Sequence, residues 1–122
     1  MSEETYTAFV ARLMKPGEEI MKEMTPKKLE LEHMANLLGS ESGEVLTYVK
    51  RHVFYGQELD MPAIKKELGD VMFAFTAICN ILGLEVEDIR ELNQEKLTAR
   101  YPLGTFSNEQ AKARADESDS VN

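Results

Sequence analysis

The sequence DMPAIKKELGDVMFAFTAICNILG, residues 60–83, decides the fold. Its apolar side chains return every three or four residues, which is the period of one face of an α-helix. That face carries Ile64, Leu68, Val71, Phe75, Ile78 and Leu82. Asp60 can cap the start of this helix, Pro62 suits its first turn, and Gly83 can end it. The stretch therefore predicts one long amphipathic helix.

A second long helix is predicted just before this one. Thr25 is a candidate N-cap and Pro26 fits the first helical position, and the helical pattern runs to about Val53. Residues 54–60 contain Gly56 and form the predicted turn. We therefore expect two long antiparallel helices at the centre of the molecule.

Two glycines, Gly39 and Gly43, stand inside the second helix on either side of Glu41. Each costs roughly 1 kcal/mol of helix propensity relative to alanine. Glycines at such positions indicate either close packing of another element or the close approach of a ligand.

Shorter helices are expected on both sides of the central pair. Residues 6–14 space their apolar side chains as a helix does, stop before Pro16, and are interpreted as a flap. Residues 86–101 form a further helix that Pro102 closes. Strand alternation and internal repeats are absent from the sequence, so the predicted fold class is all-α.

The composition limits what kind of protein this is. The 122 residues predict a single domain at 1–106 and a polar, flexible tail at 107–122. A formal net charge of -8, with scattered basic residues, argues against binding a nucleic acid polymer. The single cysteine, Cys79, cannot form an intramolecular disulfide, and no apolar run reaches the roughly 18 residues of a membrane span. The acidic N-terminus does not resemble a secretory signal, so we expect a cytoplasmic protein.

Two pairs of acidic residues are the most informative chemical feature. Glu41 with Glu44, and Glu67 with Asp70, are each three residues apart in a helix, where carboxylates lie roughly 5–6 Å from one another. Helical geometry places Glu41 and Glu67 at the edges of the apolar stripes of their helices. Carboxylates there need a partner, and hard cations such as Mg²⁺ or Mn²⁺ prefer oxygen ligands. The pattern predicts a metal site, and solvated helix surface is the open alternative.

The predicted helix at residues 86–101 carries positively charged side chains. Asn93, Lys96 and Arg100 follow one another at helical spacing along one face, which suggests an anionic guest. Salt bridges to the acidic helices, or snorkelling of the long side chains, would explain them equally well. Lys50 and Arg51 follow the pair of Glu41 and Glu44 and could also reach phosphate oxygens, although Arg51 fits an ordinary surface residue better.

Four segments together resemble the MazG-like branch of the all-alpha nucleoside triphosphate pyrophosphohydrolases. They are LGSESGEV at 38–45, ELGDV at 67–71, NQEKL at 93–97 and RYP at 100–102. In family terms these read E-x-x-E, E-x-x-D and N-x-x-K-L-x-x-R-Y-P. The resemblance covers roughly residues 33–106. Met72 and Phe73 stand where the family often has a tryptophan, which leaves base stacking there in doubt.

The resemblance implies a fold, an activity and a cofactor. The fold would be a helical hairpin or four-helix bundle completed by oligomerisation, as a homodimer or homotetramer. The activity would be Mg²⁺-dependent cleavage of a nucleoside triphosphate between its α and β phosphates, with Mn²⁺ as a substitute ion. The metal-binding residues would be Glu41, Glu44, Glu67 and Asp70.

The resemblance also implies roles for other side chains. Residues expected to bind the substrate are Asn93, Lys96, Arg100 and Tyr101, with Lys50 as a weaker match. Glu41 or Glu44 would take the proton of the attacking water, because this reaction needs a positioned water rather than a side-chain nucleophile.

Other functions stay open at the level of sequence. A related dUTPase-like pyrophosphatase would use similar carboxylate pairs, and base and sugar preference would depend on the first helix, through Tyr6 or Phe9. A helical interaction module could use its acidic faces to bind a basic partner without catalysis. Glu30 and His33 form one E-x-x-H motif, but a di-iron carboxylate protein needs two. A glycine-rich phosphate loop of the Walker type is absent from the sequence.

Overall fold

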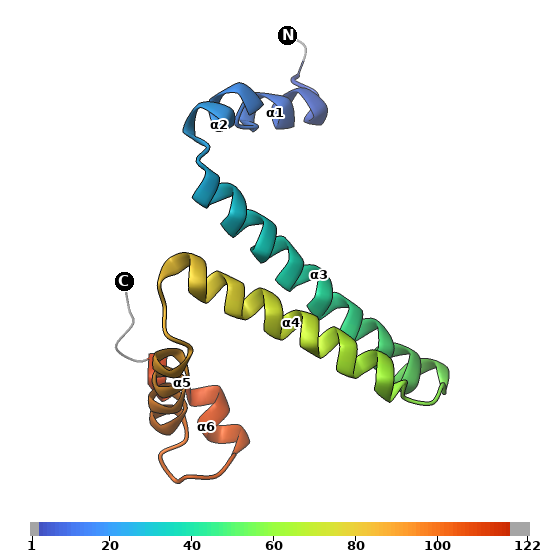
Figure 1. Cartoon of the computed structure of the whole chain (residues 1–122), viewed down its shortest axis with the longest axis vertical. Helices are drawn as coiled ribbons and strands as arrows, with labels where there is room; N and C mark the ends of the chain where they lie inside the picture. The colour runs from blue at the N-terminus through green and yellow to red at the C-terminus, as the bar shows by residue number, and fades with distance from the viewer. Residues whose placement is uncertain (1–2, 118–122) are drawn as a thin grey trace.

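The computed structural model describes residues 3–117 and consists of helices and connecting loops (Figure 1). The helices are α1 (Tyr6–Leu13), α2 (Gly17–Glu23), α3 (Pro26–Tyr55), α4 (Met61–Leu82), α5 (Val86–Arg100), α6 (Asn108–Ala113) and the short 3₁₀ helix η1 (Ala115–Glu117). No strand occurs within residues 3–117, so the predicted all-α class is confirmed.

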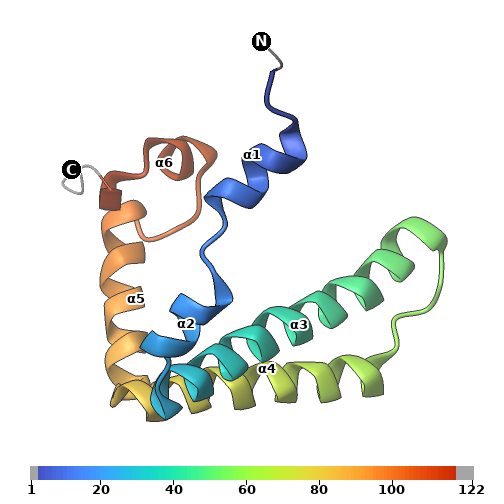
Figure 2. The same ribbon diagram turned by 90° about the horizontal axis from the view of Figure 1, so that it is seen from above.

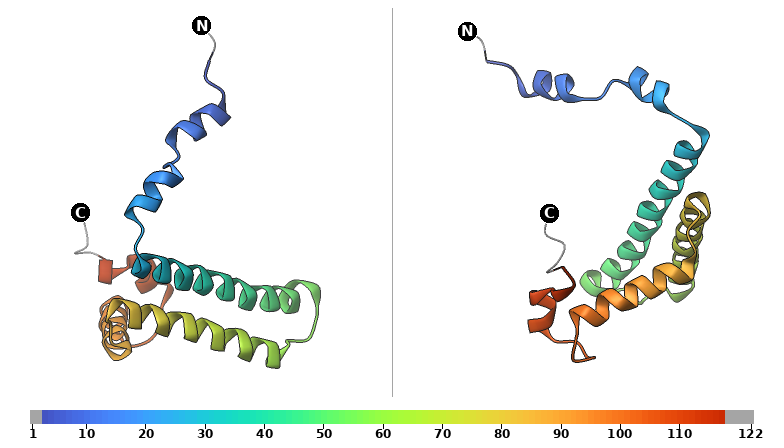
Figure 3. Two further views of the ribbon diagram at one scale, coloured as in Figure 1. Left: turned by 45° about the horizontal axis from the view of Figure 1, so that its top comes forward. Right: turned by 90° about the vertical axis from the view of Figure 1, so that its left-hand side faces the viewer.

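The centre of the molecule is the antiparallel hairpin of α3 and α4, which lie side by side in every view (Figures 1 and 3). α4 begins and ends where the sequence predicts, and α3 begins at the predicted Pro26 but runs past the predicted end near Val53 to Tyr55. Thr25 and Asp60 accept hydrogen bonds from backbone N–H groups in the first turns of α3 and α4, at 3.2 and 3.1 Å. Gly56 and Gly83 end the two helices with φ of 67° and 69°, a left-handed conformation that side chains rarely adopt.

The core of the described chain is small and lies on the inner face of α4. Ala74 and Cys79 are the fully buried apolar residues among those described, with 0% and 2% of their surface exposed. Leu68 and Leu82, which the periodicity placed in the apolar stripe, are instead 51% and 43% exposed. The stripe predicted from the sequence is thus wider than the face that α3 covers, because one neighbouring helix shields only one side of α4.

The arm before the hairpin contains one helix more than the sequence predicted. α1 ends at Leu13, as expected, and α2 follows directly after Pro16. Glu18 and Glu19 in the first turn of α2 and Lys22 in its last turn complement the helix dipole, a signal that the sequence analysis passed over. Figure 3 shows the two helices leading away from the start of α3, and neither contains a buried residue. The role of α1 as a flap stays a prediction.

The chain turns sharply after the hairpin. The axes of α4 and α5 bend by 105° at the break between them, so α5 leaves the end of the hairpin rather than packing along it (Figure 2). Among the described helices, none is long and apolar enough by itself to cross a membrane, and α4 with α5 meets that test only as this bent pair.

The segment after Phe106 differs from the sequence analysis, which placed no ordered element there. Residues 108–113 form α6, capped by the Ser107 side chain, and η1 follows. Both pack against α5. Local polar composition predicted the flexible tail, but the Ser107 cap begins α6, and hydrogen bonds and ion pairs from Arg100 of α5 reach Asp116 and Glu117 of η1. The last residues of the expected tail, 118–122, lie outside the described range.

Candidate metal centre

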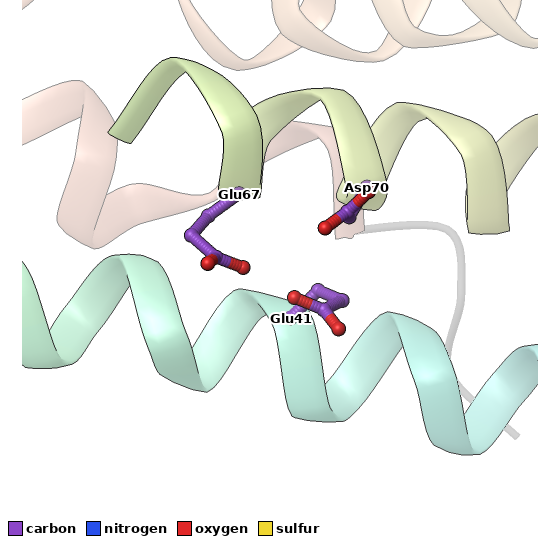
Figure 4. A group of neighbouring side chains, drawn as sticks. All are labelled: Glu41, Glu67 and Asp70. Carbon is purple, nitrogen blue, oxygen red and sulfur yellow. The ribbon is translucent and has the colours of Figure 1, made fainter. Parts of the chain in front are cut away.

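Three of the four predicted metal ligands meet across the hairpin (Figure 4). Glu41 projects from α3, and Glu67 and Asp70 project from α4 toward it. Each residue offers a carboxylate oxygen, and these oxygens all lie within 4.8 Å of one another. In the antiparallel hairpin, the middle of α3 lies opposite the first half of α4, and Glu41 meets Glu67 and Asp70 there.

Burial differs among the three carboxylates. Glu41 and Glu67 are half-buried between the helices, whereas Asp70 is exposed at the rim. Glu67 lies one turn before Val71, which is also half-buried on the inner face of α4. This agrees with the prediction that Glu41 and Glu67 border the apolar stripes of their helices.

The crowding of negative charge changes the acidity of Glu41. Its pKa is raised from 4.5 to about 7, and the largest cause is the hydrogen bond that its carboxyl group makes with Glu67. Partial burial and the charges of Glu67, Asp70 and Glu44 raise the pKa further. Near neutral pH, the proton on Glu41 therefore relieves repulsion that a cation could relieve instead.

Glu44 occupies a different place from the other three. It lies outside the group of oxygens that approach within 4.8 Å, and its side chain is exposed. Its charge nevertheless contributes to the raised pKa of Glu41, one turn earlier in α3. Glu44 thus stands at the edge of the acidic group.

The donor set fits a hard divalent cation. Mg²⁺ binds oxygen ligands at about 2.0–2.1 Å, so oxygens on opposite sides of the ion lie about 4.2 Å apart. The three carboxylate oxygens fall within 4.8 Å of one another, close to the largest separation that two ligands of one such ion can have. Sulfur and imidazole are absent from this group, which disfavours softer ions.

Lys50 lies away from the Glu41, Glu67 and Asp70 carboxylates of its own chain. It lies nine residues beyond Glu41 in α3, which is roughly half a turn away around the axis and about 13 Å along it. Its ammonium nitrogen instead stands 5.9 Å from the centre of the Tyr55 ring, near the end of the helix. A role for Lys50 in binding substrate beside these carboxylates has no support from its position.

The predicted phosphate-binding residues lie on α5, away from the acidic group. Asp70 is about 18 Å from the end of α4, and Lys96 is about 15 Å from the start of α5. With the 105° bend between the helices, their backbone positions are roughly 20 Å apart in one chain. Arg100 makes its ion pair with Asp116, and not with the acidic helices that the sequence analysis considered.

Tyr101 lines a cavity that the sequence did not reveal. Its ring lies 5.8 Å from that of Phe106, and the two rings are tilted by 43°. The cavity measures about 430 Å³, and Gln94 and Leu97 of α5 form part of its wall. Only the loop after Pro102 creates it, by folding back toward α5, so local sequence patterns could not reveal it.

Comparison with known families agrees with the fold and with the acidic group. The model of the MazG nucleotide pyrophosphohydrolase domain matches residues 29–105, which contain α3 except its first three residues, all of α4 and α5, and every residue of the candidate site. The match covers more than half of the chain, and the protein therefore belongs to the MazG nucleotide pyrophosphohydrolase family. Searches of curated proteins and of solved structures gave no significant match.

Proposed function

We propose that this protein is a Mg²⁺-dependent nucleoside triphosphate pyrophosphohydrolase, which cleaves its substrate between the α and β phosphates to give a monophosphate and pyrophosphate. The observation that carries the proposal is the meeting of Glu41, Glu67 and Asp70 across the hairpin of a MazG domain. A helical surface with no catalytic task would gain nothing from placing three carboxylates within 4.8 Å of one another, because like charges repel.

Glu41, Glu67 and Asp70 would hold the cation, with Mn²⁺ as a substitute. When bound there, the ion neutralises charge on the polyphosphate and lowers the pKa of a water molecule. Glu44 stands at the edge of the group with its carboxylate outside it, so we assign it to orienting the attacking water and accepting its proton. Glu41 is the alternative base, because it belongs to the same acidic motif, one turn before Glu44 in α3.

The cations of α5 would bind the phosphates. Lys96 and Arg100 lie one turn apart on one face of α5, and together they would offset the charge of the departing pyrophosphate. Asn93 shares that face, one turn earlier, and would orient the nucleotide. Tyr101 is turned to the cavity beside Phe106 and would contact the nucleoside.

Assembly of several copies is part of this proposal. α5 lies too far from the acidic group of its own chain to act on the same substrate, so α5 of another copy would supply these residues. The hairpin also exposes large apolar side chains on its outer faces, among them Leu46, Val53, Met72 and Phe73. Large exposed apolar side chains on a helical hairpin are expected at an interface between subunits when they form a patch. Light scattering should find a homodimer or homotetramer, and Phe73→Glu should dissociate it.

The activity is tested with the purified chain, Mg²⁺ and a panel of nucleoside triphosphates. We expect release of pyrophosphate, and loss of at least about a hundredfold in turnover for Glu67→Gln, because Gln keeps the shape but removes the charge. Glu30→Gln, which removes an exposed carboxylate of the same hairpin, is the matched control and should keep full activity. Full turnover by Glu67→Gln would refute the assigned site.

The panel also separates the alternatives. A strong preference for dUTP would indicate a dUTPase-like pyrophosphatase. Absence of pyrophosphate release with every nucleotide, together with no thermal stabilisation by Mg²⁺, would favour the non-catalytic interaction module.

A further inference from the structure

The guanidinium group of Arg100 is held by the chain's own C-terminal segment. Its Nε and one terminal nitrogen donate hydrogen bonds to the two carboxylate oxygens of Asp116, at 2.7 and 2.9 Å. Glu117 lies 3.8 Å from the same guanidinium. The side chains of Arg100 and Asp116 are only 15% and 3% exposed, so water screens this ion pair less than the other ion pairs of the described chain.

The positive charge of Lys96 also acts on the Asp116 carboxylate. The pKa of Asp116 is lowered, chiefly by its hydrogen bond from Arg100, and the positive charge of Lys96 contributes to the lowering. Asp116 thus places its negative charge close to both of the cations that we assign to phosphate binding. The Asp116 carboxylate therefore occupies the position beside Arg100 where a substrate phosphate is expected to bind.

The rest of the segment is attached weakly. We name residues 107–117 the C-terminal strap; it contains α6 and η1, and neither contains a buried residue. Besides the Arg100 pair, a long hydrogen bond of 3.4 Å from the Leu103 N–H group to Gln110 joins the strap to the chain before it. Arg114 pairs with Glu117 within the strap itself. Ion pairing between Arg100 and Asp116 is thus a short and little-exposed polar contact between the strap and α5.

We propose that the C-terminal strap is an autoinhibitory element, in which the Asp116 carboxylate competes with substrate phosphate for Arg100 and Lys96. This inference rests on the proposed role of these two cations in phosphate binding. A guanidinium group presents the same two-pronged set of donors to a carboxylate and to a phosphate, so one excludes the other. A polyphosphate carries more negative charge than Asp116 and displaces it when its concentration is high enough.

The strength of the inhibition depends on the fraction of time for which Asp116 of the strap is paired with Arg100. If the strap is seated for about nine tenths of the time, the apparent dissociation constant of the phosphate ligand rises about tenfold. Removing the charge of Asp116 abolishes this penalty. A strap that merely positioned Arg100 would give the opposite result, because losing its partner would leave the guanidinium disordered and weaken binding.

The first test measures the binding of pyrophosphate, in the presence of Mg²⁺, by titration calorimetry on the full chain. We expect Asp116→Asn to bind about five- to tenfold more tightly than the wild type. Glu109→Gln is the control, because it removes one negative charge from the exposed face of the same strap without touching Arg100. Equal or weaker binding by Asp116→Asn, or no binding by either form, overturns the inference.

The second test needs no variant. Hydrogen exchange of the wild-type protein should show faster exchange of the backbone amides of residues 108–117 when pyrophosphate is added, and unchanged exchange in α3. Unchanged exchange in the strap at saturating pyrophosphate overturns the inference. Turnover of nucleotides is measured separately. If pyrophosphate releases the strap but no nucleotide is cleaved, the proposed function fails and the autoinhibition inference stands. If nucleotides are cleaved while the strap stays on α5 in the presence of pyrophosphate, the proposed function stands and the autoinhibition inference fails.

Discussion

Glu41 on α3 and Glu67 on α4 share a hydrogen bond across the hairpin, and this contact is the largest cause of the raised pKa of Glu41, about 7. Two carboxyl groups from opposite helices can share a proton only if one of them stays protonated when an isolated carboxyl group would be charged. The contact therefore links the packing of the two helices to pH and to the binding of a cation.

The first prediction concerns the stability of the metal-free protein. Glu41 has a higher pKa in the folded chain than its ordinary value of 4.5, so its protonation stabilises the folded state at low pH. This contribution is fully present below 4.5 and is lost as the pH rises through about 7. The melting temperature in a chelator should fall between about pH 5 and pH 8. Glu41→Gln should make the decline shallower, and an equally steep decline in that variant would contradict the assignment.

A second prediction is that cation binding competes with this proton. Mg²⁺ or Mn²⁺ should raise the melting temperature of the wild type, because a ligand that binds only the folded state stabilises it. The stabilisation should be larger at pH 8 than at pH 6, since Glu41 must lose its proton to bind the ion. Differential scanning fluorimetry at both pH values measures it. Glu67→Gln should lose most of the shift, Glu30→Gln should keep it, and a shift independent of pH would count against Glu41 as a ligand.

A third prediction separates Glu44 from the other carboxylates. Because it lies outside the close group, Glu44→Gln should leave the thermal shift with Mg²⁺ nearly unchanged. Its turnover should drop by about a hundredfold to ten-thousandfold, the usual contribution of a general base. Calorimetry and a pyrophosphate assay on one preparation give both values. Loss of cation binding together with turnover would instead make Glu44 a metal ligand.

A fourth prediction tests the packing that brings the helices together. Ala74 has no exposed surface, so Ala74→Leu has to push the helices apart or strain its own rotamer. We expect a loss of about 1–3 kcal/mol in the free energy of unfolding, and weaker cation binding because the carboxylates separate. Ala99→Leu, the same change at an exposed position of α5, should stay within about 0.5 kcal/mol of the wild type. Equal effects of the two would mean that Ala74 is not a packing constraint.

The last prediction compares Lys96 with Lys50, which the family resemblance offered as a weaker match for binding substrate. Lys50 contacts Tyr55 on the far side of α3 from Glu41, whereas Lys96 lies one turn before Arg100 in α5 and its charge helps to lower the pKa of Asp116. Lys50→Gln should therefore change the KM for a nucleoside triphosphate by less than about twofold, and Lys96→Gln should raise it by about tenfold, the worth of one charged contact. Steady-state kinetics on the two variants decides between them, and the reverse order would restore Lys50 to the site.

Gly39 and Gly43 illustrate what a local sequence pattern can predict and what it cannot. Their presence in a helix indicated close packing or the approach of a ligand. In the described chain, a Cβ atom added at either position would meet nothing within 4 Å, so packing within the chain is not the reason. Ligand approach stays a prediction. A propensity penalty shows that a position is unusual, but only the neighbours in space can say why.

Local interactions decided the helices, and the sequence by itself determined them. Thr25 and Asp60 cap α3 and α4, and Gly56 ends α3, because capping depends on residues within one turn of the helix end. The spacing of Glu41 from Glu44, and of Glu67 from Asp70, is likewise a property of a single helix.

Only the tertiary structure decided which of these side chains meet. The grouping of Glu41 with Glu67 and Asp70, but without Glu44, depends on how α3 and α4 are rotated and aligned against each other, which no property of either helix sets alone. The pairing of Arg100 with Asp116 joins residues sixteen positions apart through a loop and a reversal of direction. Contacts of this kind arise from long-range packing, because the free energy that selects them comes from burial and charge between elements rather than from the conformation of any one of them.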